Sequence, residues 1–291
     1  MNSKINSVLF IALLSVSTSS VLARFLPEVS AVTISFWRLA IASLLIWIYT
    51  AFNRQILLKK ESYKFYTFSG MFLALHFTCF YGAVKLTSIA NATLLGITAP
   101  MFTILFERFF LKRPLKPLIL FGLIFVICGT FIIAGSGLLL NDGSLLGQLL
   151  GMLAALSIAM VYILAEKLRV SSNTISYTRM LYTIAALFLL FISIVGRENV
   201  FAIQSKDVLW LLLLGIVPTI LGHSLFYYAI KYTSPTIIAS VPLGEPIIAS
   251  FLAWIIFTEV VPIVTIVGGI LILLGVYIII SNSPRSRLSD I

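Results

Sequence analysis

The sequence has few charged residues, because Lys, Arg, Asp and Glu together make up only 10% of its 291 residues. A soluble domain of this size carries about a quarter. Hydrophobic residues make up 60%, and the mean hydropathy is +1.10. Charge this sparse excludes a fully solvated surface, so the composition predicts an integral membrane protein.

Several chemical motifs are absent as well. There is no G-x-x-x-x-G-K-[ST] phosphate loop, no G-x-S-x-G, no H-E-x-x-H and no dinucleotide fingerprint. The two cysteines, Cys79 and Cys128, lie within apolar runs and predict neither a disulfide framework nor a metal pair. We therefore expect no cofactor, no metal and no ATP hydrolysis by this chain.

Long apolar runs dominate what is present. A membrane-spanning helix needs about 20 mostly apolar residues. Runs such as 120–134 show none of the alternation that a membrane β-barrel requires. The sequence thus predicts an all-α membrane protein with ten spans, at 6–23, 31–52, 65–84, 91–111, 117–135, 145–165, 174–195, 207–230, 237–257 and 262–280.

The basic residues predict the orientation of these spans. The formal net charge is +10, and the charges lie in short loops, which indicates a topology signal rather than a nucleic-acid surface. With a cytoplasmic N-terminus, 14 Lys and Arg lie inside and 4 outside, with Arg38 and Arg179 within spans. Both termini are therefore expected in the cytoplasm. The first span could alternatively be a signal peptide ending at Ala23, but its removal would destroy the repeat described next. The inside residues are Lys4, Arg54, Lys59, Lys60, Lys64, Arg108, Lys112, Arg113, Lys116, Lys167, Arg169, Lys231, Arg285 and Arg287; those outside are Arg24, Lys85, Arg197 and Lys206.

One phrase occurs twice in the chain. FYGAVKLTS begins at Phe80 and FYYAIKYTS at Phe226, an offset of 146, with six of nine positions identical. The same offset aligns Pro100 with Pro246, and an offset of 141 aligns Arg38 with Arg179. The sequence therefore predicts two five-helix repeats, 1–137 and 145–283, followed by a cytoplasmic tail at 284–291.

An odd number of spans per repeat makes the second repeat enter the membrane from the opposite side. Lys85 would then lie outside and its counterpart Lys231 inside. Inverted repeats place a binding site near the membrane midplane and allow it to open to either face in turn. The pattern thus favours an alternating-access transporter.

Particular segments resemble the EamA-type branch of the drug/metabolite transporter superfamily. They are ISFWRLAIASLL (34–45), LHFTCFYGAVKLTSIANATLL (75–95), the run from Leu221 to Glu259 and GGILILLGVYI (268–278). The resemblance covers nearly the whole chain and implies ten spans as two EamA repeats. It implies a bacterial inner-membrane protein that moves amino acids, metabolites or drugs, in most members outward.

Ionisable residues inside spans are costly and mark candidate sites. His76 and Glu245 are the strongest candidates, with His223 next. Glu245 lies between Pro242 and Pro246, which remove helix hydrogen bonds and predict a kinked, partly open helix. We interpret His76 as a substrate contact, with Glu245 and His223 as proton-coupling groups. A salt bridge from Glu245 to Arg179 or Lys231, or helix–helix hydrogen bonds by the histidines, would be structural alternatives.

The remaining candidates come from the arginines and aromatic residues. Arg38 and Arg179 occupy equivalent repeat positions, which predicts one residue for the gate on each side; snorkelling to the interface is the structural alternative. A polar run in the first span, which includes Ser19, fits tight packing and cavity lining equally well. The predicted substrate-binding set is His76, Phe77, Tyr81, Trp37 and Tyr227, and the predicted helix kinks lie at Pro100, Pro242 and Pro246.

Three other functions stay open at this stage. A membrane-embedded enzyme using His76, His223 and Glu245 would lack a recognisable nucleophile and base spacing. An importer or exchanger, and a channel or scaffold, fit the same composition. A small-molecule substrate and the lipid bilayer are the expected partners, nucleic acid is not, and a homodimer is left open.

Overall fold

The computed structural model describes residues 3–53, 62–114, 116–140 and 144–282, which form helices and short connections with no β-strand among them. The predicted tail 284–291 and the basic residues Arg54, Lys59, Lys60, Arg285 and Arg287 lie outside the described residues. The helices are α1 Ser3–Ser17, α2 Ser19–Arg24, α3 Ala31–Phe52, α4 Tyr63–Leu86, α5 Ile89–Gly96, α6 Ala99–Phe110, α7 Pro117–Leu140, α8 Ser144–Arg169, α9 Thr174–Val195, α10 Ser205–Leu214, the π-helix η2 Gly215–His223, α11 Ser224–Ala229, α12 Pro235–Ser240, the 3₁₀ turn η3 Val241–Gly244, α13 Glu245–Phe257 and α14 Ile263–Asn282.

The apolar helices fall where the sequence predicts spans. Within the described residues, eight helices are long and apolar enough to cross a membrane, and Pro117–Ile133 and Ile263–Ile279 are shorter apolar helices. The eight are Lys4–Arg24, Ala31–Phe52, Tyr63–Leu86, Ile89–Phe110, Leu145–Arg169, Thr174–Val195, Ser205–Ala229 and Pro235–Phe257. The chain is a multi-pass, all-helical membrane protein.

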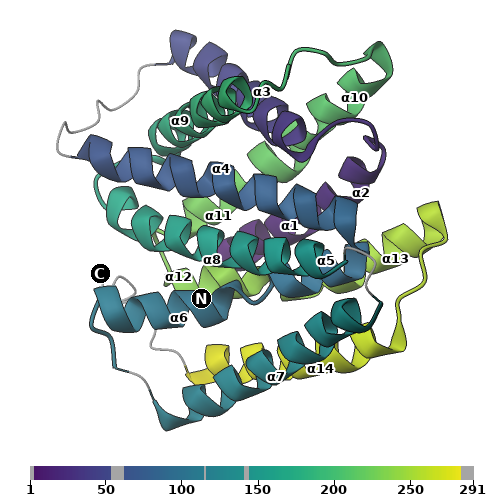
Figure 1. Cartoon of the computed structure of the whole chain (residues 1–291). Helices are drawn as coiled ribbons and strands as arrows, with labels where there is room; N and C mark the ends of the chain where they lie inside the picture. Colours follow the sequence, from purple (N-terminus) through teal and green to yellow (C-terminus); the bar gives the residue numbers. More distant parts are fainter. Residues whose placement is uncertain (1–2, 54–61, 115, 141–143, 283–291) are drawn as a thin grey trace.

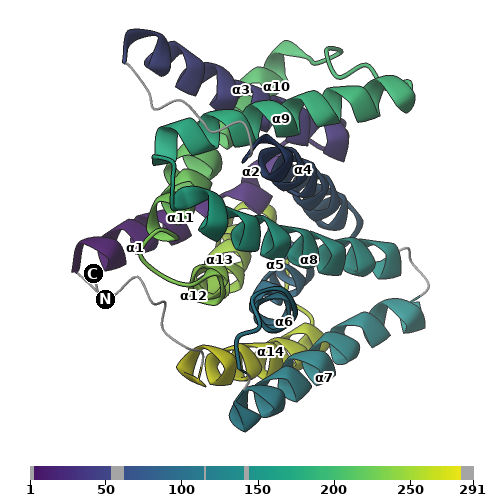
Figure 2. The same ribbon diagram turned by 90° about the vertical axis from the view of Figure 1, so that its left-hand side faces the viewer.

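The helices form a central bundle between two outer pairs. Helices α3 and α9 pack together at one side and α7 and α14 at the other (Figures 1 and 2). The α7–α14 pair exposes large apolar side chains such as Phe121, Phe131 and Tyr277. A surface of this kind suits contact with lipid. Helices α1, α4, α5, α6, α8, α11 and α12 lie between the two pairs, and α10 lies beside α3 (Figures 1 and 2).

Glycines hold α7 and α14 at close range. A Cβ added at Gly122 would lie 2.7 Å from the Gly275 carbonyl oxygen, and one at Gly129 would lie 2.5 Å from that of Gly268. The two contacts show that the helices run antiparallel with touching backbones, as small residues permit in membranes. The offset of 146 converts Gly122 to Gly268 and Gly129 to Gly275, so it converts one contact into the other. The two repeats thus contribute equivalently to this pair.

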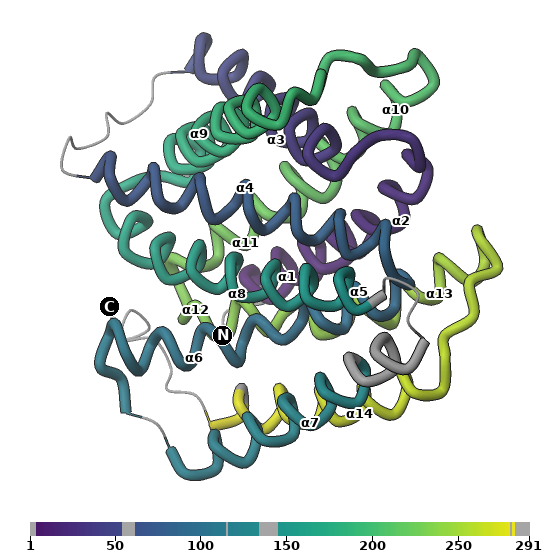
Figure 3. The backbone as a smooth tube through the Cα atoms, viewed as in Figure 1, coloured from purple at the N-terminus to yellow at the C-terminus, as the bar shows by residue number. Residues whose placement is uncertain are grey.

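The fourth helix of each repeat is broken at its middle. Residues 97–98 separate α5 from α6, and η3 separates α12 from α13. Each half packs against the opposite half of the other repeat, α5 with α13 and α12 with α6 (Figure 3). The final Ser of each repeated phrase begins these helices, because the Ser88 and Ser234 side chains accept hydrogen bonds from the amides of Asn91 and Ile237.

The antiparallel pair α4 and α8 defines the two ends of the bundle. Leu86 lies against Gly147, while the Lys167 ammonium lies 3.8 Å from the ring centre of Phe65. At 1.5 Å per residue, the 24 residues of α4 span about 36 Å, which is enough to cross a bilayer core of about 30 Å. We refer to the end near Leu86 as the Arg24 end, and to the end near Phe65 as the Arg113 end, after the arginines described below.

Candidate functional site

A small cavity of about 50 Å³ lies in the central bundle. Both repeats contribute to the cavity wall. The first contributes α1, α2, α4, α5 and α6, and the second contributes α8, η2, α11, α12 and the η3–α13 junction. The lining residues are Val16, Ser19, His76, Phe77, Phe80, Thr93, Gly96, Ala99, Ile158, Tyr162, His223, Phe226, Ala239, Pro242 and Glu245.

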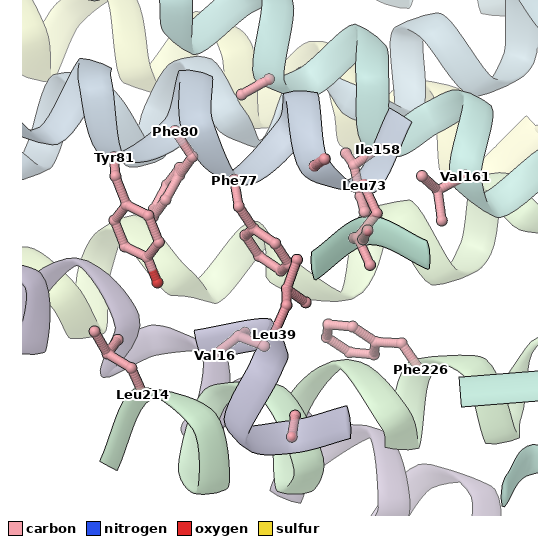
Figure 4. Close-up of a cluster of buried hydrophobic side chains, with 14 of the residues drawn as sticks. Val16, Leu39, Leu73, Phe77, Phe80, Tyr81, Ile158, Val161, Leu214 and Phe226 are labelled. Carbon is pink, nitrogen blue, oxygen red and sulfur yellow. The ribbon is translucent and has the colours of Figure 1, made fainter. Parts of the chain in front are cut away.

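Aromatic side chains form much of this wall. Phe77, Phe80 and Tyr81 point from α4 into the interior, where Val16 of α1 and Phe226 of α11 meet them (Figure 4). The Phe77 ring packs edge-on against His223, with ring centres 5.0 Å apart. The cavity therefore offers an apolar, aromatic surface with a few polar groups set into it.

The two histidines meet at this cavity. Their ring centres are 6.0 Å apart. The Nδ1 atom of His76 lies 2.9 Å from the Ala154 carbonyl oxygen, and since a carbonyl only accepts, Nδ1 carries the proton. Nδ1 of His223 is buried without a hydrogen-bond partner. The pair thus presents ring nitrogens that a solute or water can engage.

Arg38 lies beside the same cavity and is fully buried. Its Nε donates to the Thr219 hydroxyl at 2.6 Å, and Nη1 donates to the hydroxyls of Ser19 at 2.8 Å and of Tyr81. Its Cζ lies 3.9 Å from the ring centre of Phe77, which places the cation over an aromatic face. These contacts bring together α2, α3, α4 and η2 around one guanidinium group.

Glu245 enters the cavity wall at the first position of α13. The ion pairs among the described residues do not include it, so neither Arg179 nor Lys231 bridges to its carboxyl group. The 3₁₀ turn that contains Pro242 precedes it, and Pro246 follows it in the first turn of α13. The carboxyl group is therefore presented at a helix break.

The other predicted site residues lie elsewhere. Trp37 donates from Nε1 to the Val200 carbonyl at 2.7 Å and packs against Phe201, outside the cavity lining. Arg179 stacks on Trp47, 4.5 Å from its ring centre. Tyr227 is buried among other tyrosines with its hydroxyl unpaired. Of the predicted set, His76, Phe77, His223, Pro242 and Glu245 line the cavity, Arg38 and Tyr81 contact its walls, and Trp37, Tyr227, Arg179, Pro100 and Pro246 are not among the lining residues.

An ion pair lies at the Arg24 end of the bundle. Arg24, the last residue of α2, contacts the carboxylate of Glu259 at 3.2 Å and donates to the Thr87 carbonyl at 2.9 Å. The other oxygen of Glu259 accepts from the backbone amide of Ile89, the first residue of α5, at 2.6 Å. A carboxylate is favourable at a helix N-terminus because amides there lack partners within the helix. The cluster joins the first helix of one repeat to the fourth helix of the other.

A matching cluster lies at the Arg113 end. Arg113 contacts Glu166 of α8 at 2.8 Å and Glu107 of α6 at 3.2 Å. Glu107 is fully buried and accepts from the amide of Thr236 in the first turn of α12 at 3.2 Å. Under the offset of 146, Arg113 corresponds to Glu259, so equivalent positions carry opposite charges and each pairs with the first helix of the other repeat.

The comparison with known families covers both halves of the chain. The model of the EamA-like transporter family matches residues 3–135 and again residues 145–281. The chain belongs to the EamA-like transporter family. The two matches coincide with the two repeats that the sequence predicts, and membership indicates a membrane transporter of small solutes rather than an enzyme.

Individual relatives agree with this assignment. The Pseudopaline exporter CntI of Pseudomonas aeruginosa is 26% identical over 276 residues, which is 93% of this chain and 95% of that protein. An uncharacterised transporter of Archaeoglobus fulgidus is 24% identical over 286 residues, covering 96% of this chain and 98% of the relative. One solved crystal structure matches with a TM-score of 0.69 at 15% identity, over 96% of this chain and 97% of that one, which shows the fold alone.

Sequence reasoning missed the two end clusters. Glu107, Glu166 and Glu259 were not singled out, although Asp and Glu together number only 10 in the chain. The small number of acidic residues was the available signal. An acidic residue near the end of an apolar run needs a partner, so each of them was a candidate for an ion pair. Ser19 was noted only as part of a polar run, and Thr219, the other hydroxyl partner of Arg38 besides Tyr81, gave no signal.

Proposed function

We propose that this EamA-like protein is a secondary exporter with ten spans in two inverted repeats, which exposes the central cavity to either side of a bacterial inner membrane in turn. Both termini are cytoplasmic in this proposal. The Arg24 end then faces outward and the Arg113 end faces the cytoplasm. One observation carries the proposal: repeat-related ion-pair clusters lie at opposite ends of a bundle, with the cavity lined by His76, His223 and Glu245 between them.

The clusters support alternating access because each crosses between the repeats. Arg24 and Glu259 come from different repeats, and so do Arg113 and Glu166. Opening a path at one end requires its cluster to separate, while the other cluster can remain closed. In this proposal the clusters take the gating role that the sequence assigned to Arg38 and Arg179.

Export is the proposed direction because CntI, which aligns over nearly the whole chain, is named as an exporter. The absence of a phosphate loop from the sequence leaves a solute or ion gradient as the source of energy. Glu245 is the proposed proton carrier, since its carboxyl group lines the cavity and forms no ion pair in the described structure. His76 is proposed to contact the solute through its ring.

An untargeted export assay tests the function. The assay measures the metabolites that accumulate in the medium of three strains. One overproduces the wild-type protein, one lacks it and one overproduces the Glu245→Gln variant. We expect a defined set of small solutes to accumulate with the wild-type protein only. Those solutes should then show saturable flux and counterflow in proteoliposomes, which separates a transporter from a channel. Equal media from all three strains would refute export.

A further inference from the structure

Arg38 carries a positive charge that the described protein does not neutralise at contact distance. The guanidinium group is fully buried, yet the ion pairs in the described structure involve Arg24 and Arg113 instead. A buried charge without a partner is strongly disfavoured. Its Nη2 atom, moreover, is buried with no hydrogen-bond partner among the described residues.

The groups around Arg38 do not depend on it for their own hydrogen bonds. The hydroxyls of Ser19 and Tyr81 lie 3.0 Å apart and bond to each other. The Thr219 hydroxyl donates to the Leu214 carbonyl at 2.7 Å. These three neutral hydroxyls accept hydrogen bonds from the guanidinium and fix its orientation, but they do not neutralise its charge.

The position of the guanidinium directs it towards the cavity. Ser19 and Phe77, which contact its Nη1 and Cζ atoms, are both lining residues. Arg38 itself is not a lining residue, so a solute seated against Phe77 meets the cation once Ser19 or Phe77 moves aside. The lining contains no Lys and no Arg, and its acidic residue is Glu245, so Arg38 directly behind the wall is the cation available to a solute. One guanidinium with one free nitrogen suits a singly charged anion better than a phosphate, which needs more donors.

We infer, on the basis of the proposed transport function, that Arg38 anchors the carboxylate group of the transported solute. The substrates are then small carboxylates with an apolar or aromatic body that packs against Phe77, Phe80 and Phe226. A hydrogen bond between ionised groups is the strongest kind available to proteins, and its loss from a buried site weakens binding about 10- to 100-fold.

The repeat provides a matched control. Arg179 occupies the equivalent position in the second repeat, but it stacks on Trp47 and is not part of the lining. Met has a similar length and no charge, so Arg38→Met and Arg179→Met make the same chemical change at two sites. Because the hydroxyl partners of Arg38 retain other hydrogen bonds, we expect Arg38→Met to fold with a melting temperature near that of the wild type.

The experiment compares metabolites in the medium of cells that produce wild-type protein, Arg38→Met, Arg179→Met or no protein at all. We expect the solutes exported by the wild type to carry a carboxylate, their export to fall about 10- to 100-fold in Arg38→Met, and Arg179→Met to match the wild type. In proteoliposomes, the carboxamide of an exported acid should move at least 10-fold more slowly than the acid.

Two results would refute the role of Arg38 as the carboxylate anchor without refuting the proposed transport function. They are wild-type export of solutes that lack a carboxylate, and full export of the carboxylates by Arg38→Met. If Arg38→Met does not fold, the acid and its carboxamide are compared on the wild type alone, and equal rates overturn the anchor. Failure of the wild type to export any solute would instead refute the proposed function itself.

Discussion

Removal of one charge from either end cluster should bias the protein towards opening at that end. Glu259→Gln removes the charge that faces Arg24 but keeps an oxygen that can accept from the Ile89 amide. Glu166→Gln makes the same change opposite Arg113. Glu28→Gln, at an exposed side chain near the Arg24 end, is the matched control for loss of charge alone.

The size of the effect follows from exposure. The side chains of Arg24 and Glu259 are 28% and 21% exposed, and those of Arg113 and Glu166 are 28% and 14% exposed. Ion pairs at this degree of exposure contribute about 1 kcal/mol. Loss of one pair should therefore shift the equilibrium between closed and open ends about five-fold.

Cysteine labelling measures this shift. In a background with Cys79→Ala and Cys128→Ala, Ala239→Cys places a thiol in the cavity wall. A membrane-impermeant maleimide should label it about five-fold faster from outside in Glu259→Gln, and about five-fold faster from the cytoplasm in Glu166→Gln. Glu28→Gln should match the parent. Faster labelling from the same side in both variants would refute the gating role of the clusters.

Other predictions concern the cavity and the outer helix pair. Glu245→Gln should abolish uphill transport while solute exchange continues, and uphill transport with an unchanged dependence on external pH would show that Glu245 is structural. His76→Ala should raise the half-saturating solute concentration about 10-fold, as expected for one lost polar contact, and an unchanged value would remove His76 from the site. Gly129→Ala should destabilise the protein by about 1–3 kcal/mol, because its Cβ would lie 2.5 Å from a backbone oxygen of α14. Gly96→Ala is the control, since the nearest atom to its Cβ would lie 3.9 Å away, and it should leave the stability unchanged. Equal melting temperatures of the two variants would contradict the close packing of α7 and α14.

The sequence predicted the helical class and the position of the repeats because both depend on patterns along the chain. Apolar runs of about 20 residues locate helices without any tertiary information. The repeated phrase at Phe80 and Phe226 fixed the offset of 146, which also relates the glycine contacts of α7 and α14. Pro242 and Pro246 marked the region where the helix breaks, since proline removes backbone hydrogen bonds.

The surroundings of each arginine could not be predicted from patterns along the chain. Arg38 and Arg179 are equivalent in sequence, yet one is buried beside the cavity and the other stacks on Trp47. The difference depends on what each guanidinium meets across helices: Ser19, Tyr81 and Thr219 are distant in the chain from Arg38. Pairing such as that of Arg24 with Glu259 joins residues 235 positions apart, and no local pattern predicts it.

The most direct test of the account is the sidedness of two equivalent residues. Leu86 and Tyr232 are related by the offset of 146, are the seventh residues of the two repeated phrases and are 43% and 45% exposed. Single cysteines at these positions are labelled with an impermeant maleimide in intact cells and in inverted vesicles. With an inverted repeat, Leu86→Cys reacts from outside only and Tyr232→Cys from the cytoplasm only. Reaction of both from the same side would contradict the inverted repeat and, with it, the alternating-access mechanism.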